Sequence, residues 1–459
     1  MKTEKRDTFS SKLGLLMAVI ASAVGLGCIW RFPYLLGENG GGAFLLLYLI
    51  FMLLIGMPVM IAEFVIGRKG QRNTFRSFKE LSPKSHWYII GLGGIFASAL
   101  ILSFYSTVSG WALHYMMVAA KNIFTRPVGI DHELVFATFT SGIGLPLFWM
   151  VAFISLSAAV VILGVQKGIE KYSKILMPIL FFSLIILVIK GLTLSGSYEG
   201  VKFLFYPDFS KINTASILAA LGQAAFSLGV GVGVLVTFGS YIKKEENLSL
   251  IAISVTLINL VISIIAAMAI IPAMMALNIP ANEGPGLVYI VYPAIFEQMR
   301  GGYVFAFSFF LMIIIAALTS AIPLLEVMVS FFGEELKIKR SKATLIAATI
   351  PAFLGIFTTL SFGVLKNFKI FGFTVFEGAD YLVSNILLPL GMFFIVIFLG
   401  WFYNKDKVKE EITNQGKLSA RFFPLFLFLI KYIVPIGVIF IFLKGLGMEG
   451  LGILERALG

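Results

Sequence analysis

Long apolar runs occupy most of the chain and constrain its fold more than any other feature. The chain has 459 residues, of which 59% are hydrophobic and 13% are charged. A helix needs roughly 20 apolar residues to cross a bilayer, and a window of that length predicts about eleven spans. We expect an all-α polytopic membrane protein with 11 transmembrane helices, at about 10–35, 41–67, 88–120, 146–165, 169–192, 215–242, 249–278, 302–336, 342–362, 371–404 and 421–445.

The basic residues predict the orientation of these spans. The net charge is +12, and most of the 36 Lys and Arg fall in the N-terminal tail and in alternate connections, such as RKGQRNTFRSFKE at 68–80. The positive-inside rule then predicts a multi-pass protein of the plasma membrane with a cytoplasmic N-terminus and an outer C-terminus. The positive charge therefore reflects topology and the lipid bilayer, and no nucleic-acid partner is expected.

Two spans are interrupted by glycine. The first contains SAVGLGCIWRFP at 22–33, and the sixth, five spans later, contains SLGVGVG at 227–233. Alternating glycines point to different faces of a helix, so a single packing seam does not explain Gly229, Gly231 and Gly233, and unwinding explains them better. Interruptions at corresponding positions of two halves indicate an inverted repeat. We expect five-helix units at 1–192 and 215–404, and an extra helix at 421–445.

Unwound backbone in the middle of a membrane must find partners other than lipid. The N-terminal ends of half-helices offer N–H donors to a carboxylate, and freed carbonyls offer hard oxygen ligands to an alkali cation. Cys28 is the only cysteine, which excludes an internal disulfide.

Four motifs resemble the neurotransmitter:sodium symporter family, especially its bacterial amino-acid transporters. They are GLLMAVIASAVGLGCIWRFPYLLGENGGGAF (14–44), QKGIEKYSKILMP (166–178), FSLGVGVGVLVTFGSY (226–241) and ALTSAIPLLEV (317–327). The resemblance covers nearly the whole chain. It implies a leucine-transporter-like 5+5 inverted repeat with broken helices 1 and 6, and sodium-coupled uptake by alternating access.

The resemblance also implies a substrate pocket. Family members that carry monoamines place an aspartate at the position of Gly25, whereas a glycine there implies a substrate that brings its own carboxylate. Tyr105 would bind that carboxylate, and the small Gly229 and Val232 leave room for a branched, Met-like or aromatic side chain. The expected pocket comprises Ser22, Ala23, Gly25, Ile101, Tyr105, Phe226, Ser227, Gly229, Val232, Ser320 and Leu324.

Two sodium sites and one chloride site follow from the same resemblance. The first sodium site, with oxygen ligands only, would comprise Ala21, Val24, Ala316, Thr319 and Ser320. The second would comprise Ala23, Cys28, Ser227 and Asn259, but most relatives have an asparagine at the position of Cys28. Because sulfur is a poor ligand for a hard cation, we expect sodium to be weakened or absent there. Tyr48, Gln223, Ser227, Asn259 and Ser263 resemble the chloride site of animal members.

Charged residues on both sides of the pocket match the gates of the family. Outside, Arg31 would pair through water with Asp380, and Phe226 would cover the substrate. On the cytoplasmic side, Arg6 would pair with Glu334, although positive-inside bias accounts equally well for Arg6. Glu63 in the second span would bind backbone amides freed in the sixth.

The sequence also bears on other classes of function. An enzyme is disfavoured, because GLGMEG at 445–450 lacks a preceding strand and the three histidines have no metal spacing. A channel would need repeated ring elements along a pore. An amino-acid-binding sensor (transceptor), or a symporter coupled mainly to another ion, would share every motif. The particular amino acid and the oligomeric state are not predicted.

Overall fold

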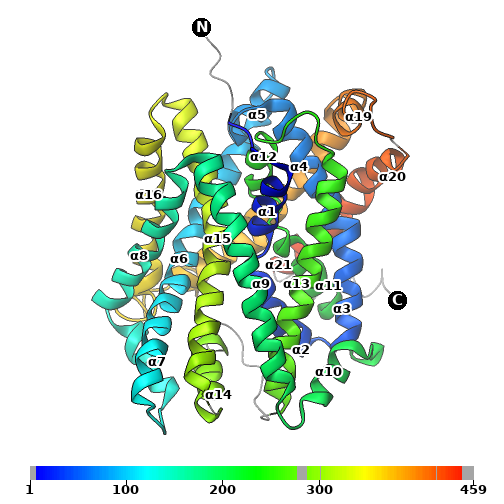
Figure 1. Cartoon of the computed structure of the whole chain (residues 1–459). Helices are drawn as coiled ribbons and strands as arrows, with labels where there is room; N and C mark the ends of the chain where they lie inside the picture. The colour runs from blue at the N-terminus through cyan, green and yellow to red at the C-terminus, as the bar shows by residue number, and fades with distance from the viewer. Residues whose placement is uncertain (1–6, 277–286, 300, 420, 447–459) are drawn as a thin grey trace.

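The computed structural model describes residues 7–276, 287–299, 301–419 and 421–446, and these are almost entirely helical (Figure 1). The helices are α1 Lys12–Ala23, α2 Phe32–Glu38, α3 Gly42–Phe51, α4 Met57–Gly70, α5 Thr74–Leu81, α6 Tyr88–Thr125, α7 His132–Ser141, α8 Gly144–Val161, α9 Lys171–Leu192, α10 Ser197–Phe205, α11 Thr214–Ser227, α12 Val234–Gly239, α13 Leu248–Ala276, α14 Tyr292–Gln298, α15 Gly302–Glu335, α16 Arg340–Leu360, α17 Val375–Tyr381, α18 Leu388–Ile397, α19 Lys405–Ile412, α20 Phe423–Phe428 and α21 Val434–Gly445. Single π-helical turns join several of them, such as Met52–Gly56 between α3 and α4.

Within the described residues, nine helical segments are long and apolar enough to cross a membrane. The bent pair Lys12–Ala23 and Gly27–Glu38 makes a tenth span. The expected sixth span consists of α11 and α12, which are too short to pass the same test. An all-helical membrane fold is therefore confirmed. The count of eleven is reached only when the two short halves are taken as one span.

The first break lies between α1 and α2. Val24 leaves the helical conformation with φ −91° and ψ 93°, and a π-helical turn at Gly27–Arg31 follows before α2. The two halves of this span are bent by 56°. Pro33 lies near the start of α2, directly after this π-helical turn. The glycine-interrupted stretch of the first span thus coincides with this break and the π-helical turn that follows it.

The second break lies between α11 and α12. Gly229, Gly231 and Gly233 have φ of +62°, +91° and +78°, a region that residues with a Cβ rarely adopt. This confirms the unwinding that alternating glycines predicted.

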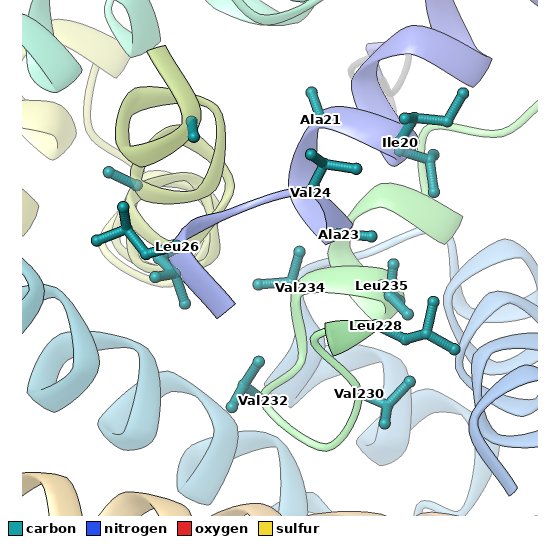
Figure 2. Packing of buried hydrophobic residues seen from close by; sticks show 14 of the residues in the cluster. Ile20, Ala21, Ala23, Val24, Leu26, Leu228, Val230, Val232, Val234 and Leu235 are labelled. Atoms are coloured by element: carbon teal, nitrogen blue, oxygen red, sulfur yellow. The ribbon is translucent and has the colours of Figure 1, made fainter. Parts of the chain in front are cut away.

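The two breaks lie against each other in the interior. Figure 2 shows Val24 and Leu26 of the first break, and Val232 and Val234 of the second, among the buried hydrophobic residues of one cluster. Asn259 of α13 joins both breaks, because its Nδ2 donates to the carbonyl of Ala23 at 3.0 Å and to that of Ser227 at 3.1 Å. The freed backbone groups of both spans are therefore gathered into one buried region.

Short helices cover the two ends of the bundle. At one end, α5 and α19 lie beside the basic connections; at the other end lie α7, α10 and α14 (Figure 1). The division into two inverted five-helix units stays a prediction.

Candidate functional site

At the first break, Gly25 lies close to two hydroxyl groups, which leave little room for a side chain at this position. A Cβ on Gly25 would lie 2.2 Å from Ser320 Oγ and 3.3 Å from Tyr105 Oη. The phenol of Tyr105, on α6, accepts the backbone N–H of Leu26 at 3.4 Å. A hydroxyl and an N–H of the break thus lie side by side, as a carboxylate-binding site requires.

Phe226 lies over this pocket at the end of α11. A Cβ on Gly27 would come within 2.7 Å of the Phe226 ring, so the ring lies directly against the first break. The guanidinium of Arg31 lies over the other part of the ring, 4.7 Å from its centroid. This is a cation–π distance, which places the expected cover and gate residues together.

Space remains beside the second break. A Cβ on Gly229 would have only the carbonyl of Ser22 within 4 Å, at 3.8 Å. Val232 and Leu324 are buried and Ile101 is partly buried. The side of the pocket that would receive a substrate side chain is therefore apolar, and Gly229 does not fill it.

The first candidate cation site is built from α1 and α15. The Thr319 hydroxyl lies 3.2 Å from the carbonyl of Val24 and 2.9 Å from that of Ala316. These three oxygens converge as expected. The Ser320 hydroxyl, in contrast, lies beside Gly25 in the substrate pocket.

The second candidate cation site contains a thiol and an amide donor. Cys28 Sγ lies 3.5 Å from the carbonyl of Ala23 and 3.6 Å from Asn259 Oδ1. Asn259 Nδ2 donates to the carbonyls of Ala23 and Ser227, and it also lies 3.3 Å from the sulfur. All four expected residues meet here, but an amide nitrogen lies between the two carbonyls.

The expected chloride residues also lie together. Tyr48 Oη is 3.3 Å from Asn259 Oδ1 and 3.5 Å from Ser263 Oγ, and Gln223 Nε2 donates to Ser227 Oγ at 2.9 Å. Gln223 Nε2 also donates to the carbonyl of Gly27 at 2.9 Å. This set of hydroxyl and amide groups adjoins the second candidate cation site through Ser227 and Asn259.

The carboxylate of Glu63 lies where it was expected. It is fully buried on α4, and its Oε1 accepts the backbone N–H of Gly231 at 2.6 Å. The prediction that Glu63 binds an amide freed in the sixth span is confirmed.

The two expected ion-pair gates are only partly described. Asp380 accepts a hydrogen bond from Ser384 at 3.0 Å, and within the described ranges no ion pair joins it directly to Arg31. Their pairing through water stays a prediction. Arg6 lies outside the described residues, as does most of GLGMEG. Glu334 accepts from the backbone N–H and from Nδ2 of Asn73, at 2.9 and 3.0 Å.

Sequence reasoning missed two buried acids, Glu326 and Glu170. The carboxylate of Glu326 accepts hydrogen bonds from the guanidinium of Arg340 at 2.5 Å and from the hydroxyl of Tyr241 at 2.6 Å. Glu170 bonds Ser10, Ser11 and Lys174. Glu326 lies inside a long apolar run, where an acid requires a partner, so the sequence alone could have predicted that this acid is paired. The identity of each partner was not, because the partners lie on other segments.

Comparison with known proteins identifies the family. The model described as "Sodium:neurotransmitter symporter family" matches residues 6–126 and 134–449. The chain is 39% identical to the uncharacterized sodium-dependent transporter YhdH of Bacillus subtilis, over 98% of this chain and 99% of that protein. It is 27% identical to the sodium-dependent dopamine transporter of Bos taurus, over 90% of this chain and 65% of that protein.

A solved structure has the same fold. The crystal structure of MhsT in complex with L-phenylalanine matches with a TM-score of 0.88 and 40% sequence identity, over 96% of this chain and all of that one. The match confirms the leucine-transporter-like fold, and the match to a family of transporters speaks against an enzyme. The chain belongs to the sodium:neurotransmitter symporter family.

Proposed function

We propose that this chain is a sodium-coupled symporter for a zwitterionic amino acid with a large apolar or aromatic side chain, working by alternating access. One observation carries the substrate class: the Tyr105 hydroxyl and the N–H of Leu26 meet beside Gly25, which carries no side chain. A hydroxyl and a backbone N–H suit a carboxylate. No acidic side chain is available at position 25 to pair with a bare amine.

The shape of the apolar part of the pocket supports a large side chain. Gly229 leaves the space next to Ser22 open, and Val232, Ile101 and Leu324 provide apolar walls. MhsT, with 40% identity, was crystallised with L-phenylalanine. The carbonyls around Phe226 and Ser227 would take the substrate ammonium.

The first cation site supports sodium as the coupling ion. Its proposed ligands are the neutral oxygens of Val24, Ala316 and Thr319. Ala21 and Ser320 belong to this set by family resemblance alone. Neutral oxygens without a carboxylate suit a monovalent cation better than calcium. With the basic ends of α5 and α19 on the cytoplasmic side, the N-terminus would lie inside and the C-terminus outside.

Uptake into proteoliposomes tests this proposal. An inward sodium gradient should drive accumulation of phenylalanine or tryptophan above equilibrium, and a proton gradient alone should not. A sensor would bind the amino acid without accumulating it, and accumulation driven equally by protons would show that another ion is coupled.

Tyr105→Phe tests the carboxylate contact. Its loss should cost about 1.5 to 3 kcal/mol of amino-acid binding, which calorimetric titration measures. Phenylethylamine, which lacks the carboxylate, should bind poorly to the parent. Unchanged affinity in Tyr105→Phe, or a preference for the amine, would contradict the proposed substrate class.

A further inference from the structure

The segment before α1 is fixed to the bundle by one buried acid. The side chain of Glu170 is 1% exposed and lies at the end of the π-helical turn Val165–Glu170, just before α9. Its Oε2 accepts the backbone N–H of Ser10 at 2.7 Å. Its Oε1 accepts the hydroxyls of Ser10 at 2.6 Å and Ser11 at 2.9 Å. Lys174 provides a fourth contact at 2.7 Å.

Three of these four hydrogen bonds come from Ser10 and Ser11. A carboxylate has about four acceptor positions, and Glu170 receives four hydrogen bonds, three of them on Oε1. If α1 moved away from α9, only Lys174 would still bind Glu170, and a buried acid with most of its partners removed is unfavourable. The contact therefore opposes separation of α1 from α9.

Position 14 shows how closely the acid fits into the first turn of α1. A Cβ on Gly14 would lie 1.9 Å from Glu170 Oε1. Ser11 caps the same turn by accepting the N–H of Gly14 at 3.1 Å. A carboxylate next to a helix N-terminus is also favoured by the helix dipole.

Neighbouring contacts extend the attachment on both sides. Phe9 is buried with its ring 5.8 Å from that of Phe238 and 6.2 Å from that of Tyr241. Gln166 Nε2 donates to the carbonyl of Thr8 at 2.7 Å. Residues 8–11 are thus held between the start of α9 and the end of α12.

The other end of α1 carries the candidate cation ligands. α1 has 12 residues, so it is about 18 Å long. There the carbonyl of Ala23, the last residue of α1, accepts from Asn259, and the carbonyl of Val24, the next residue, accepts from Thr319. Because α1 is a single short helix, a shift at Ser11 moves these carbonyls as well.

We propose that Glu170 is a positioning residue for the transport cycle: it latches Ser10 and Ser11 to α9 and so sets how readily α1 leaves its place. This proposal rests on the proposed function for its effect on transport. Weakening the latch should increase the mobility of α1 and lower the apparent affinity for sodium, because the Val24 carbonyl is then held less often beside Thr319.

Hydrogen exchange on the full-length protein in nanodiscs measures the latch without transport. Glu170→Gln keeps the size of the side chain and removes its charge, and Gly14→Ala displaces the acid without changing any charge. Both variants should speed amide hydrogen exchange over residues 8–20 several-fold when sodium is present. Glu410→Gln, an exposed cytoplasmic acid that pairs with Lys69, is the matched control and should leave this exchange unchanged.

Sodium titration of uptake measures the consequence. Glu170→Gln should raise the sodium concentration for half-maximal uptake several-fold, with saturating sodium restoring most of the rate; a merely destabilised protein would not recover. Parent-like exchange in both variants would overturn the latch. If exchange changes while the parent shows no sodium-driven uptake, the latch stands and the proposed function fails.

Discussion

The two candidate cation sites share the same broken helix but are completed by different kinds of side chain. At the first site, α15 brings the Thr319 hydroxyl to the carbonyls of Val24 and Ala316. At the second, α13 brings the amide nitrogen of Asn259 to the carbonyls of Ala23 and Ser227. The Thr319 hydroxyl has one proton, which it can rotate away to offer lone pairs to a cation, whereas both N–H groups of the Asn259 amide are aimed at carbonyls that a cation would need.

This difference shows what a helix break does and does not determine. A helix break leaves carbonyl oxygens without their helical hydrogen bonds, and a buried carbonyl needs another partner. Whether that partner is an ion or a donor of the protein depends on the helix packed opposite. Cys28 adds a thiol, a soft and weak ligand, at the second site only. We therefore expect one well-formed sodium site and one weakened or absent site.

The largest expected effect is at the first site. Thr319→Val keeps the shape of the side chain and removes its hydroxyl, so it should abolish sodium-driven uptake. Sodium binding should weaken by about 1.5 to 3 kcal/mol, or roughly 10- to 150-fold. Sodium-dependent thermal stabilisation of the purified protein measures the binding.

Thr349→Val is the matched control. Its hydroxyl bonds within α16, to the carbonyl of Leu345 at 2.8 Å, on an exposed face. It should leave uptake unchanged. Full sodium-driven uptake by Thr319→Val would remove the distinction between the two sites.

A smaller effect, opposite in sign, is expected at the second site. Cys28→Asn supplies an oxygen where the thiol lies, and should raise the Hill coefficient for sodium from about one toward two at saturating substrate. Cys28→Ala removes the thiol without adding an oxygen and should not. If the parent already couples two sodium ions to each substrate, and Cys28→Asn changes nothing, position 28 does not control the site.

The comparison also shows where the sequence is informative. Apolar runs predicted the spans, and glycines predicted both breaks, because these depend on local composition. Glu63 could be matched with the sixth span because a buried acid next to freed amides has few alternatives. The orientation of Asn259 and the contact of Glu170 with Ser10 and Ser11 were not predictable. They depend on how segments far apart in the chain pack, and no local pattern encodes that.

A still smaller effect is expected from chloride. The cluster around Tyr48 and Gln223 adjoins the second cation site, so an anion there would act on that site more than on the first. Replacing chloride by gluconate should lower uptake a few-fold at limiting sodium, and Tyr48→Phe should reduce this dependence. Identical uptake in both salts would count against a chloride site.

The smallest effect concerns an acid remote from both cation sites, and it separates general stability from sodium binding. Glu297, on α14, lies 2.7 Å from His132 Nε2, and it accepts the backbone N–H groups of Gly129 and Ile130. Burial alone would raise the pKa of Glu297. The hydrogen bonds from His132, Ile130 and Gly129 outweigh burial and hold the pKa below its ordinary value.

Because the folded-state pKa of Glu297 is depressed, its contribution to stability is present above the unfolded pKa of about 4.3 and is lost as pH falls through the folded pKa. As the pH falls below about 4, the melting temperature should therefore fall slightly more steeply in the parent than in Glu297→Gln. At neutral pH, Glu297→Gln should lower the melting temperature slightly and leave the sodium-induced increase in melting temperature intact, because the acid touches neither cation site. A loss of that increase would mean that the contact between α14 and residues 129–132 is coupled to sodium binding, and the two sites could then no longer be compared in isolation.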